Sequence, residues 1–163
     1  MSRWPDALTP TRLFAAAVVL PLLSVAAALV SQHVFDMQPC PWCVLQRAIF
    51  VAIALAALPG LLVRSAPLRR ASAAVFGLLA VSGVAAALWQ HFVAASSTSC
   101  NLTLADRIMS GLGLDSLLPE VFAAYASCAD AAVDLLGLPY EFYSLALYLL
   151  LAAAAVALLR RPL

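Results

Sequence analysis

Four long apolar runs alternate with polar connections along the chain of 163 residues. They cover residues 13–32, 43–63, 71–91 and 142–159, and none of them shows the period-two alternation of a β-strand. About 20 helical residues cross a hydrocarbon layer of roughly 30 Å, so each run is long enough to span a membrane. Inside lipid, only helices or closed barrels satisfy the backbone hydrogen bonds. The pattern therefore predicts an all-α membrane protein, a four-transmembrane-helix bundle that forms one membrane domain over residues 1–163.

Composition agrees with that prediction and excludes several other classes. Hydrophobic residues make up 65% of the chain, charged residues make up 10%, and the mean hydropathy is +1.01. Soluble domains have about 45–50% apolar and about 25% charged residues, and disordered chains are more polar still. The net charge is only +1, and the nine basic residues, all arginine, form no stripe with aromatic residues. We therefore expect no nucleic-acid partner.

The arginines predict the orientation of the bundle. Basic residues gather in the cytoplasmic connections of membrane proteins. Seven arginines precede the first run, fill the link between the second and third runs, or follow the fourth run. The connections over residues 33–42 and 92–141 hold seven acidic residues against Arg107 alone. We expect these two loops to face outward and both termini to be cytoplasmic. The first run has a second interpretation, as a cleaved signal peptide.

The second outward loop carries an amphipathic pattern of its own. Apolar residues recur at steps of three and four from Leu114 to Tyr125, with Asp115 and Glu120 between them. Pro119 favours the first turn of a helix, where its missing N–H costs nothing. We expect a short helix starting near Pro119 and lying at the membrane interface.

The four cysteines, Cys40, Cys43, Cys100 and Cys128, all fall in the outward connections or at their border. Cys40 and Cys43 form a C-x-x-C pair where the second span begins, and the free N–H groups of a helix amino terminus stabilise a thiolate there. Three interpretations compete: two structural disulfides, a zinc site of four thiolates, and dithiol exchange between a pair near the membrane and a pair in the long loop. Structural zinc usually takes two closely spaced ligand pairs, which favours exchange and predicts no metal.

Three polar residues near the pair are candidates for binding an electron acceptor. Arg47, the only charged residue inside a span, lies one turn below Cys43 on the same helix face. It is interpreted either as an interface anchor or as a cation that stabilises a Cys43 thiolate and an anionic acceptor. His91 ends the third span at the level where the second begins, so it either supplies a proton or binds water and head groups. Gln46 either orients Arg47 or binds the acceptor.

These residues resemble a known family. The string from Gln38 to Arg47, which reads QPCPWCVLQR, together with Cys100 and Cys128 in a second outer loop, is similar to the disulfide bond formation protein B (DsbB) family of bacterial inner membranes. The Pro-Trp dipeptide within the pair is less typical of that family. The resemblance covers nearly the whole chain and includes the Leu136-Gly137-Leu138-Pro139 stretch before the last span.

The resemblance implies an activity, which is that of a thiol:quinone oxidoreductase. Disulfides Cys40–Cys43 and Cys100–Cys128 would accept electrons from a periplasmic DsbA-like thiol oxidase. Cys100 would form the mixed disulfide, Cys128 would attack Cys40, and Cys43 would face a quinone, either ubiquinone or menaquinone, beside Arg47. It also implies an inner-membrane location with the cysteines in the periplasm, and a supply of quinone from the lipid.

Two rival functions remain open from the sequence. A reductase similar to the vitamin K epoxide reductase family also couples cysteines to a quinone-like ring, but that family places its C-x-x-C later in the bundle. A disulfide-stapled membrane scaffold without catalysis is the other rival.

Overall fold

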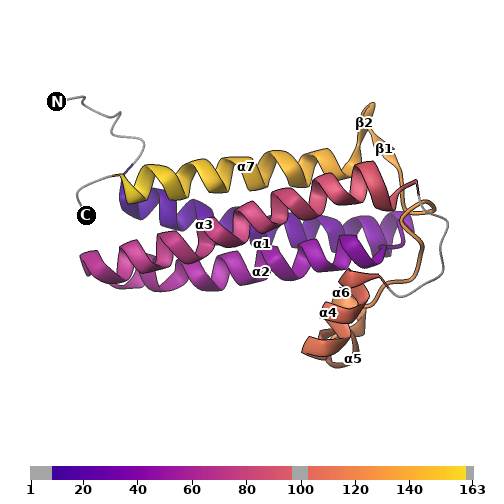
Figure 1. The fold of residues 1–163 in the computed structure, drawn as a ribbon, viewed down its shortest axis with the longest axis horizontal. Coiled ribbons are helices and arrows are strands. Elements are labelled where there is room, and N and C mark those ends of the chain that lie inside the picture. The colour runs from indigo at the N-terminus through magenta and orange to yellow at the C-terminus, as the bar shows by residue number, and fades with distance from the viewer. Residues whose placement is uncertain (1–8, 97–102, 161–163) are drawn as a thin grey trace.

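Four long helices pack side by side into one bundle in the computed structural model, which describes residues 9–96 and 103–160 (Figure 1). The four helices are α1 (Pro10–Phe35), α2 (Pro41–Leu62), α3 (Ala66–Trp89) and α7 (Tyr140–Leu159). Each is long and apolar enough to cross a membrane, with α3 continued by a π-helical turn, η2 (Gln90–Ala94). The protein is thus an all-α, four-helix, multi-pass membrane protein, as the sequence predicts.

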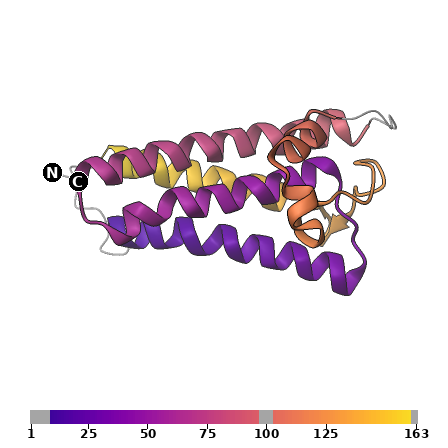
Figure 2. The same cartoon turned by 90° about the horizontal axis from the view of Figure 1, so that it is seen from below.

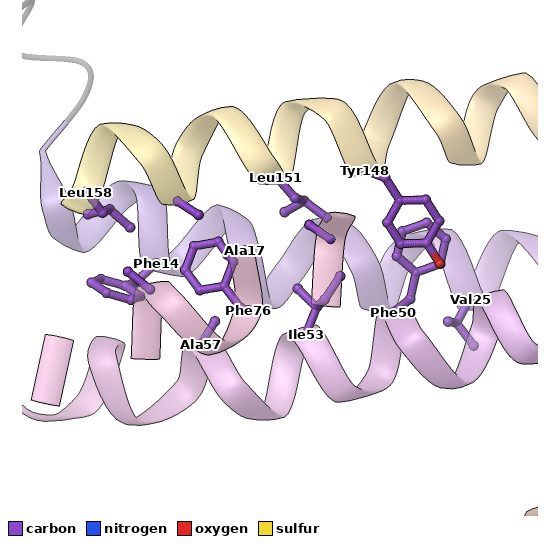
Figure 3. Close-up of a cluster of buried hydrophobic side chains, with 13 residues drawn as sticks. Phe14, Ala17, Val25, Phe50, Ile53, Ala57, Phe76, Tyr148, Leu151 and Leu158 are labelled. Atoms are coloured by element: carbon purple, nitrogen blue, oxygen red, sulfur yellow. The ribbon is translucent and has the colours of Figure 1, made fainter. Parts of the chain in front are cut away.

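All four helices contribute side chains to the core. Phe50 of α2 stacks on Tyr148 of α7 with ring centroids 4.2 Å apart, and Phe14 of α1 meets Phe76 of α3 edge to face at 6.0 Å (Figure 3). Aromatic pairs in these geometries stabilise a core beyond the area that they bury. Many other side chains face lipid, so the bundle has one narrow packed centre rather than a broad soluble core.

Gly83 allows α3 to approach α7 closely. A Cβ atom added at Gly83 would overlap the ring of Tyr148. We expect Gly83→Ala to lower the free energy of unfolding by about 1–3 kcal/mol, the usual cost of overpacking a core. Thermal unfolding in detergent measures this. The control is Gly111→Ala, in an exposed part of α4 (Leu104–Leu112) where nothing lies within 4 Å of the added Cβ. An equal loss at Gly111 would contradict the explanation.

All four helices begin before the predicted spans. Thr9 caps α1 through its side chain, and Asp36 ends α1 in the left-handed region, so the helix exceeds residues 13–32 at both ends. The third span begins at Ala66, before the predicted residue 71, because Arg69 and Arg70 are part of its first turns. Arg69 reaches back to donate to the carbonyl oxygen of Gly60, at 3.1 Å, and thereby ties α3 to α2.

The connection between α3 and α7 contains more helix than the sequence predicts. A helix begins at Pro119 as expected, but α6 (Pro119–Phe122) has only four residues, and α5 (Leu114–Leu117) and α4 precede it. A capping box between Thr103 and Asp106 starts α4, and Gly113 ends it with φ of 67°. Both signals are visible in the sequence and were missed. Together the three helices lie against the end of the bundle where α2 begins (Figures 1 and 2).

A tight hairpin connects this loop to the last helix. Strands β1 (Asp134–Leu135) and β2 (Leu138–Pro139) pair antiparallel. Leu136 and Gly137 form the turn with φ of 54° and 82°. Two positive φ values are typical of a type I′ turn, whose twist matches that of the strands. The hairpin sets the position at which α7 enters the bundle, close to the start of α2 (Figure 1).

Candidate functional site

Cys40 and Cys43 lie at the amino-terminal end of α2, as predicted. Cys40 is the N-cap, and its sulfur accepts a hydrogen bond from the backbone N–H of Cys43 at 3.3 Å. The two Sγ atoms lie 2.6 Å apart. Pro41 occupies the first helical position, where no N–H is needed. The helix terminus therefore holds both sulfurs face to face, with Cys40 fully buried and Cys43 partly exposed.

Cys128 comes from the long outward loop and lies against Cys40. Cys128 is close enough to Cys40 and to the backbone N–H of Trp42 for these groups to shift its pKa, and it shifts that of Cys40 in return. Three sulfurs are thus in sequence, with Cys40 between the other two. Among the described residues Cys40, Cys43 and Cys128 are free cysteines. Cys40 and Cys43 are not bonded in the structure, so their predicted disulfide stays a prediction; the predicted Cys100–Cys128 disulfide also stays a prediction, because Cys100 lies outside the described residues.

The contacts within this sulfur cluster shift the pKa values of Cys40 and Cys128 in opposite directions. The hydrogen bond with Cys128, followed by the one with Cys43, raises the pKa of the Cys40 thiol. The same contact with Cys40, and then the Trp42 N–H, lowers the pKa of Cys128, although burial opposes the change. Cys128 is therefore the more readily ionised of the two, and the thiolate is the form of cysteine that attacks a disulfide.

Arg47 is buried one turn below Cys43, with 6% of its surface exposed. Its Nη1 donates to Oε1 of Gln32 at 2.7 Å and to the Val121 carbonyl oxygen at 3.0 Å, while Nη2 donates to the Ala28 carbonyl oxygen at 3.5 Å. The guanidinium thus joins α1, α2 and α6. Arg47 and Cys43 line the same two cavities, as their spacing on one helix face predicts.

Gln46 and Gln90 form a second polar contact with the site. Gln46 donates to Oε1 of Gln90 at 2.7 Å, and Gln90 donates to Sγ of Cys43 at 3.4 Å. Gln90 is the first residue of the π-helical turn, and such turns often occur at functional sites because they redirect side chains. The backbone of Gln46 is also held in place, because the Tyr148 hydroxyl donates to the backbone carbonyl oxygen of Gln46 at 2.8 Å. Gln46 is thus connected to Cys43 through Gln90, and it lines the same cavity as Arg47.

His91 pairs with a buried carboxylate. Its Nδ1 lies 2.7 Å from Oε1 of Glu141, the second residue of α7. The Glu141 side chain is 6% exposed, whereas that of His91 is 29% exposed. Glu141 belongs to the wall of the cavity that contains Cys43, and His91 lies behind it. The structure thus brings His91 close to the site at the level that was predicted, but outside the cavity wall.

Two cavities meet at Cys43 and Arg47. A narrow one of about 50 Å³ extends into the bundle between α1, α2 and α7. A wider one of about 600 Å³ lies beneath the α1–α2 connection and the long loop before α7. Cys43 and Arg47 line both, together with Ala28 and Tyr140. A third, apolar cavity of about 980 Å³ lies on the other side of α2 and reaches Cys128 and Trp42.

Sequence reasoning missed three residues that the structure places at the site: Gln32, Gln90 and Glu141. A polar side chain in or beside an apolar span is costly unless it has a partner, so the position of each of these three residues already indicated a buried polar contact. What the sequence did not show was the partner. Gln32 holds Arg47, Gln90 holds Cys43, and Glu141 holds His91.

The described residues contain no group of three or more His, Cys, Asp or Glu side chains that could hold a metal ion. The chemistry available to this site is that of sulfur beside a cation. It can exchange disulfides at the outer end of the bundle and present a thiolate to the cavities beneath.

Comparison with known proteins agrees with the geometry. The family model described as "Disulfide bond formation protein DsbB" matches residues 10–158. A protein from Aromatoleum aromaticum named "Disulfide bond formation protein B" is 34% identical over 154 residues, which cover 89% of this chain and 92% of that protein. A protein of the same name from Herminiimonas arsenicoxydans is 33% identical over 141 residues, covering 86% and 88%. With cysteines at the start of the second of four spans, the chain belongs to the DsbB family of disulfide bond formation proteins, which are membrane oxidoreductases.

Proposed function

We propose that this protein is a thiol:quinone oxidoreductase, which reoxidises a DsbA-like thiol oxidase in the periplasm and passes the electrons to a membrane quinone. The observation that carries the proposal is the sulfur sequence Cys128, Cys40, Cys43, which leads from the outward loop to Arg47 and the cavities. Disulfide exchange requires sulfurs that can reach one another; Cys40 and Cys43 lie 2.6 Å apart, and Cys128 is close enough to Cys40 to shift its pKa.

Exchange has to enter through the loop pair because Cys40 is fully buried. The partner's thiolate attacks Cys100 of the Cys100–Cys128 disulfide, and a mixed disulfide forms while Cys128 leaves as a thiolate. Cys128 then attacks Cys40, and Cys43 leaves as a thiolate beside Arg47. Attack of the partner's second thiolate on the mixed disulfide releases Cys100. Cys100 restores the loop disulfide by attacking Cys128 and thereby frees Cys40.

The electron pair leaves the protein in the last step, when Cys40 and Cys43 bond again and two thiols lose two electrons and two protons. A quinone supplies the matching chemistry when bound, since it takes up two electrons and two protons. The residues around Cys43 fit such a ring: Arg47 is cationic, Gln90 is polar, and Val25 and Phe50 form apolar walls. The narrow cavity is smaller than a ring, so the head group belongs at its junction with the wider outer cavity.

The same proposal includes the location. The excess of arginine in the connections of one side supports an orientation with both termini in the cytoplasm and the cysteines in the periplasm, in the inner membrane of a bacterium. The start of α2 and the helices α4 to α6 lie at the opposite end of the bundle from the start of α1 and the end of α7, which fits that orientation (Figure 1).

Cys128→Ser tests the proposed route. We expect quinone reduction driven by reduced DsbA to fall at least about 100-fold, since the substitution removes the one cysteine of the described part of the loop, which lies beside Cys40. Reduction driven by dithiothreitol, which is small enough to reach the partly exposed Cys43, should continue within about twofold of the wild-type rate.

The same measurements at lower pH should show that the wild-type exchange step persists below the ordinary thiol pKa of about 8.5, because the pKa of Cys128 is lowered.

Ser127→Ala is the matched control, since Ser127 lies next to Cys128 and its hydroxyl contacts only Asp130 among the described side chains. It should leave both reactions unchanged. If the protein with Cys128→Ser oxidised DsbA at the wild-type rate, the proposed route would be wrong.

A further inference from the structure

A buried carboxylate without a role in sulfur exchange lines the cavity of Cys43. The Glu141 side chain is 6% exposed and is the one acidic group among the described residues that line this cavity. A buried charge is costly unless a partner compensates it, and here the partner is His91, with 2.7 Å between Nδ1 and Oε1. The pair connects a cavity wall to a side chain that remains 29% exposed.

The arrangement has the order that proton transfer requires. Glu141 lies at the cavity and His91 lies between Glu141 and the exterior, packed against Phe142 with ring centroids 4.7 Å apart. Imidazole gains and loses protons near neutral pH, and a carboxyl group within hydrogen-bond distance can pass a proton on. If the contact between His91 and Glu141 served only to join η2 to α7, the carboxylate would not have to lie in the cavity wall.

We propose that Glu141 and His91 form a proton-transfer pair that delivers protons to the electron acceptor beside Cys43; this rests on the proposed function. The Glu141 carboxyl group gives a proton to a ring oxygen as that oxygen gains electron density. His91 in its protonated form then returns a proton to the Glu141 carboxylate and takes another from outer water. Two such transfers accompany the two electrons from Cys40 and Cys43, whose own two thiol protons leave to water, so each turnover balances.

The other groups around Glu141 fit this role. Cys43 and Arg47 of α2 and Tyr140 of α7 are the remaining titratable or charged residues of the cavity wall, and α1 contributes only Ser24, Val25 and Ala28. Arg47 is held by Gln32 and by carbonyl oxygens, and Cys43 is the electron donor. Glu141 is the one group in this wall that has both an acidic proton and a path outward.

Glu141→Gln is the decisive variant because glutamine retains the shape and can still accept a hydrogen bond from His91. The full-length protein, with Cys40 and Cys43 reduced, is mixed with a short-chain ubiquinone, and quinol formation is followed in a single turnover from pH 5 to pH 9. General acid catalysis contributes about 10²–10⁴-fold, so we expect a loss of about 100-fold. The variant should be slower than the wild type at every pH, and its pH profile should differ in shape from that of the wild type, because only the wild type has the carboxyl group in the transfer.

Two further variants separate a proton-transfer role from a structural one. Glu141→Asp retains the acid and should recover part of the rate. Glu120→Gln is the matched control, since Glu120 also faces a histidine, His33, at 3.9 Å, but is 79% exposed. It should behave as the wild type. A Glu141→Gln protein with wild-type rate and pH profile overturns the inference, as does one with lowered thermal stability and unchanged rate. If the wild-type protein itself reduces no quinone, the proposed function fails instead.

Discussion

Cys43→Ser is expected to reduce quinone reduction by at least about 10³-fold, with any donor, because serine offers no thiolate and no second sulfur for the Cys40 disulfide. Of the described cysteines, Cys43 is the one that lines both cavities beside Arg47, so no neighbouring sulfur replaces it there. The measurement is quinol formation with reduced DsbA and, separately, with dithiothreitol. This is the largest effect that we expect of any single substitution.

The same variant should retain its fold and its exchange chemistry. The sulfur of Cys43 contacts Cys40 and Gln90, and a hydroxyl group can accept the Gln90 hydrogen bond. We therefore expect thermal unfolding within a few degrees of the wild type. In this variant the Cys40 thiolate can attack Cys128 of the Cys100–Cys128 disulfide and release Cys100 as a thiolate, so the Cys40–Cys128 disulfide should accumulate, which mass spectrometry of peptides would detect. A non-catalytic scaffold would show neither this disulfide nor any loss of turnover, since it has none to lose.

Arg47→Met is expected to lower both stability and activity. Hydrogen bonds to a charged group contribute about 1.5–3 kcal/mol, and the substitution leaves the Gln32 and Val121 oxygens without their donor. We expect the free energy of unfolding to fall by about 2–3 kcal/mol. Quinone reduction should fall by about 100-fold at saturating donor, since the cation beside the Cys43 thiolate and the acceptor is lost.

Arg69→Met separates the two effects. Arg69 also donates to a backbone carbonyl, that of Gly60, and its guanidinium lies 5.8 Å from the Phe14 ring centroid, but it lies in the first turns of α3, beside the end of α2 that is farthest from Cys43. This variant should lose stability and retain its rate per folded molecule. An Arg47→Met protein that is destabilised but reduces quinone at the wild-type rate would show that Arg47 only holds the helices together.

Local patterns in the sequence were sufficient for the bundle and for half of the site. Helical spacing alone places Arg47 below Cys43, and a C-x-x-C pair that starts with Cys40 at the N-cap brings the two sulfurs together. The capping box that starts at Thr103 shows that local signals could have found α4 as well. These features depend on residues within one or two turns of each other.

The remaining contacts depend on how distant segments pack. Gln32 and Glu120 are 88 positions apart, and Gln46 meets Gln90 across 44 positions. The order of Glu141 and His91 relative to the cavity follows from where the hairpin lets α7 enter the bundle, which no pattern in α3 or α7 specifies. For that reason the sequence predicted His91 at the correct level and missed the carboxylate in front of it.

The most direct test of the account is a single turnover without any partner protein. The wild-type protein, reduced to its thiol form and freed of reductant, is mixed anaerobically with one equivalent of short-chain quinone, and the quinone absorbance and the free thiols are followed together. We predict that one quinol forms for every Cys40–Cys43 pair that closes, in the wild type and in Cys128→Ser at equal rates, and that none forms in Cys43→Ser. Quinol formation that survives the loss of Cys43, or that requires Cys128, would contradict the transfer of electrons from Cys43 beside Arg47.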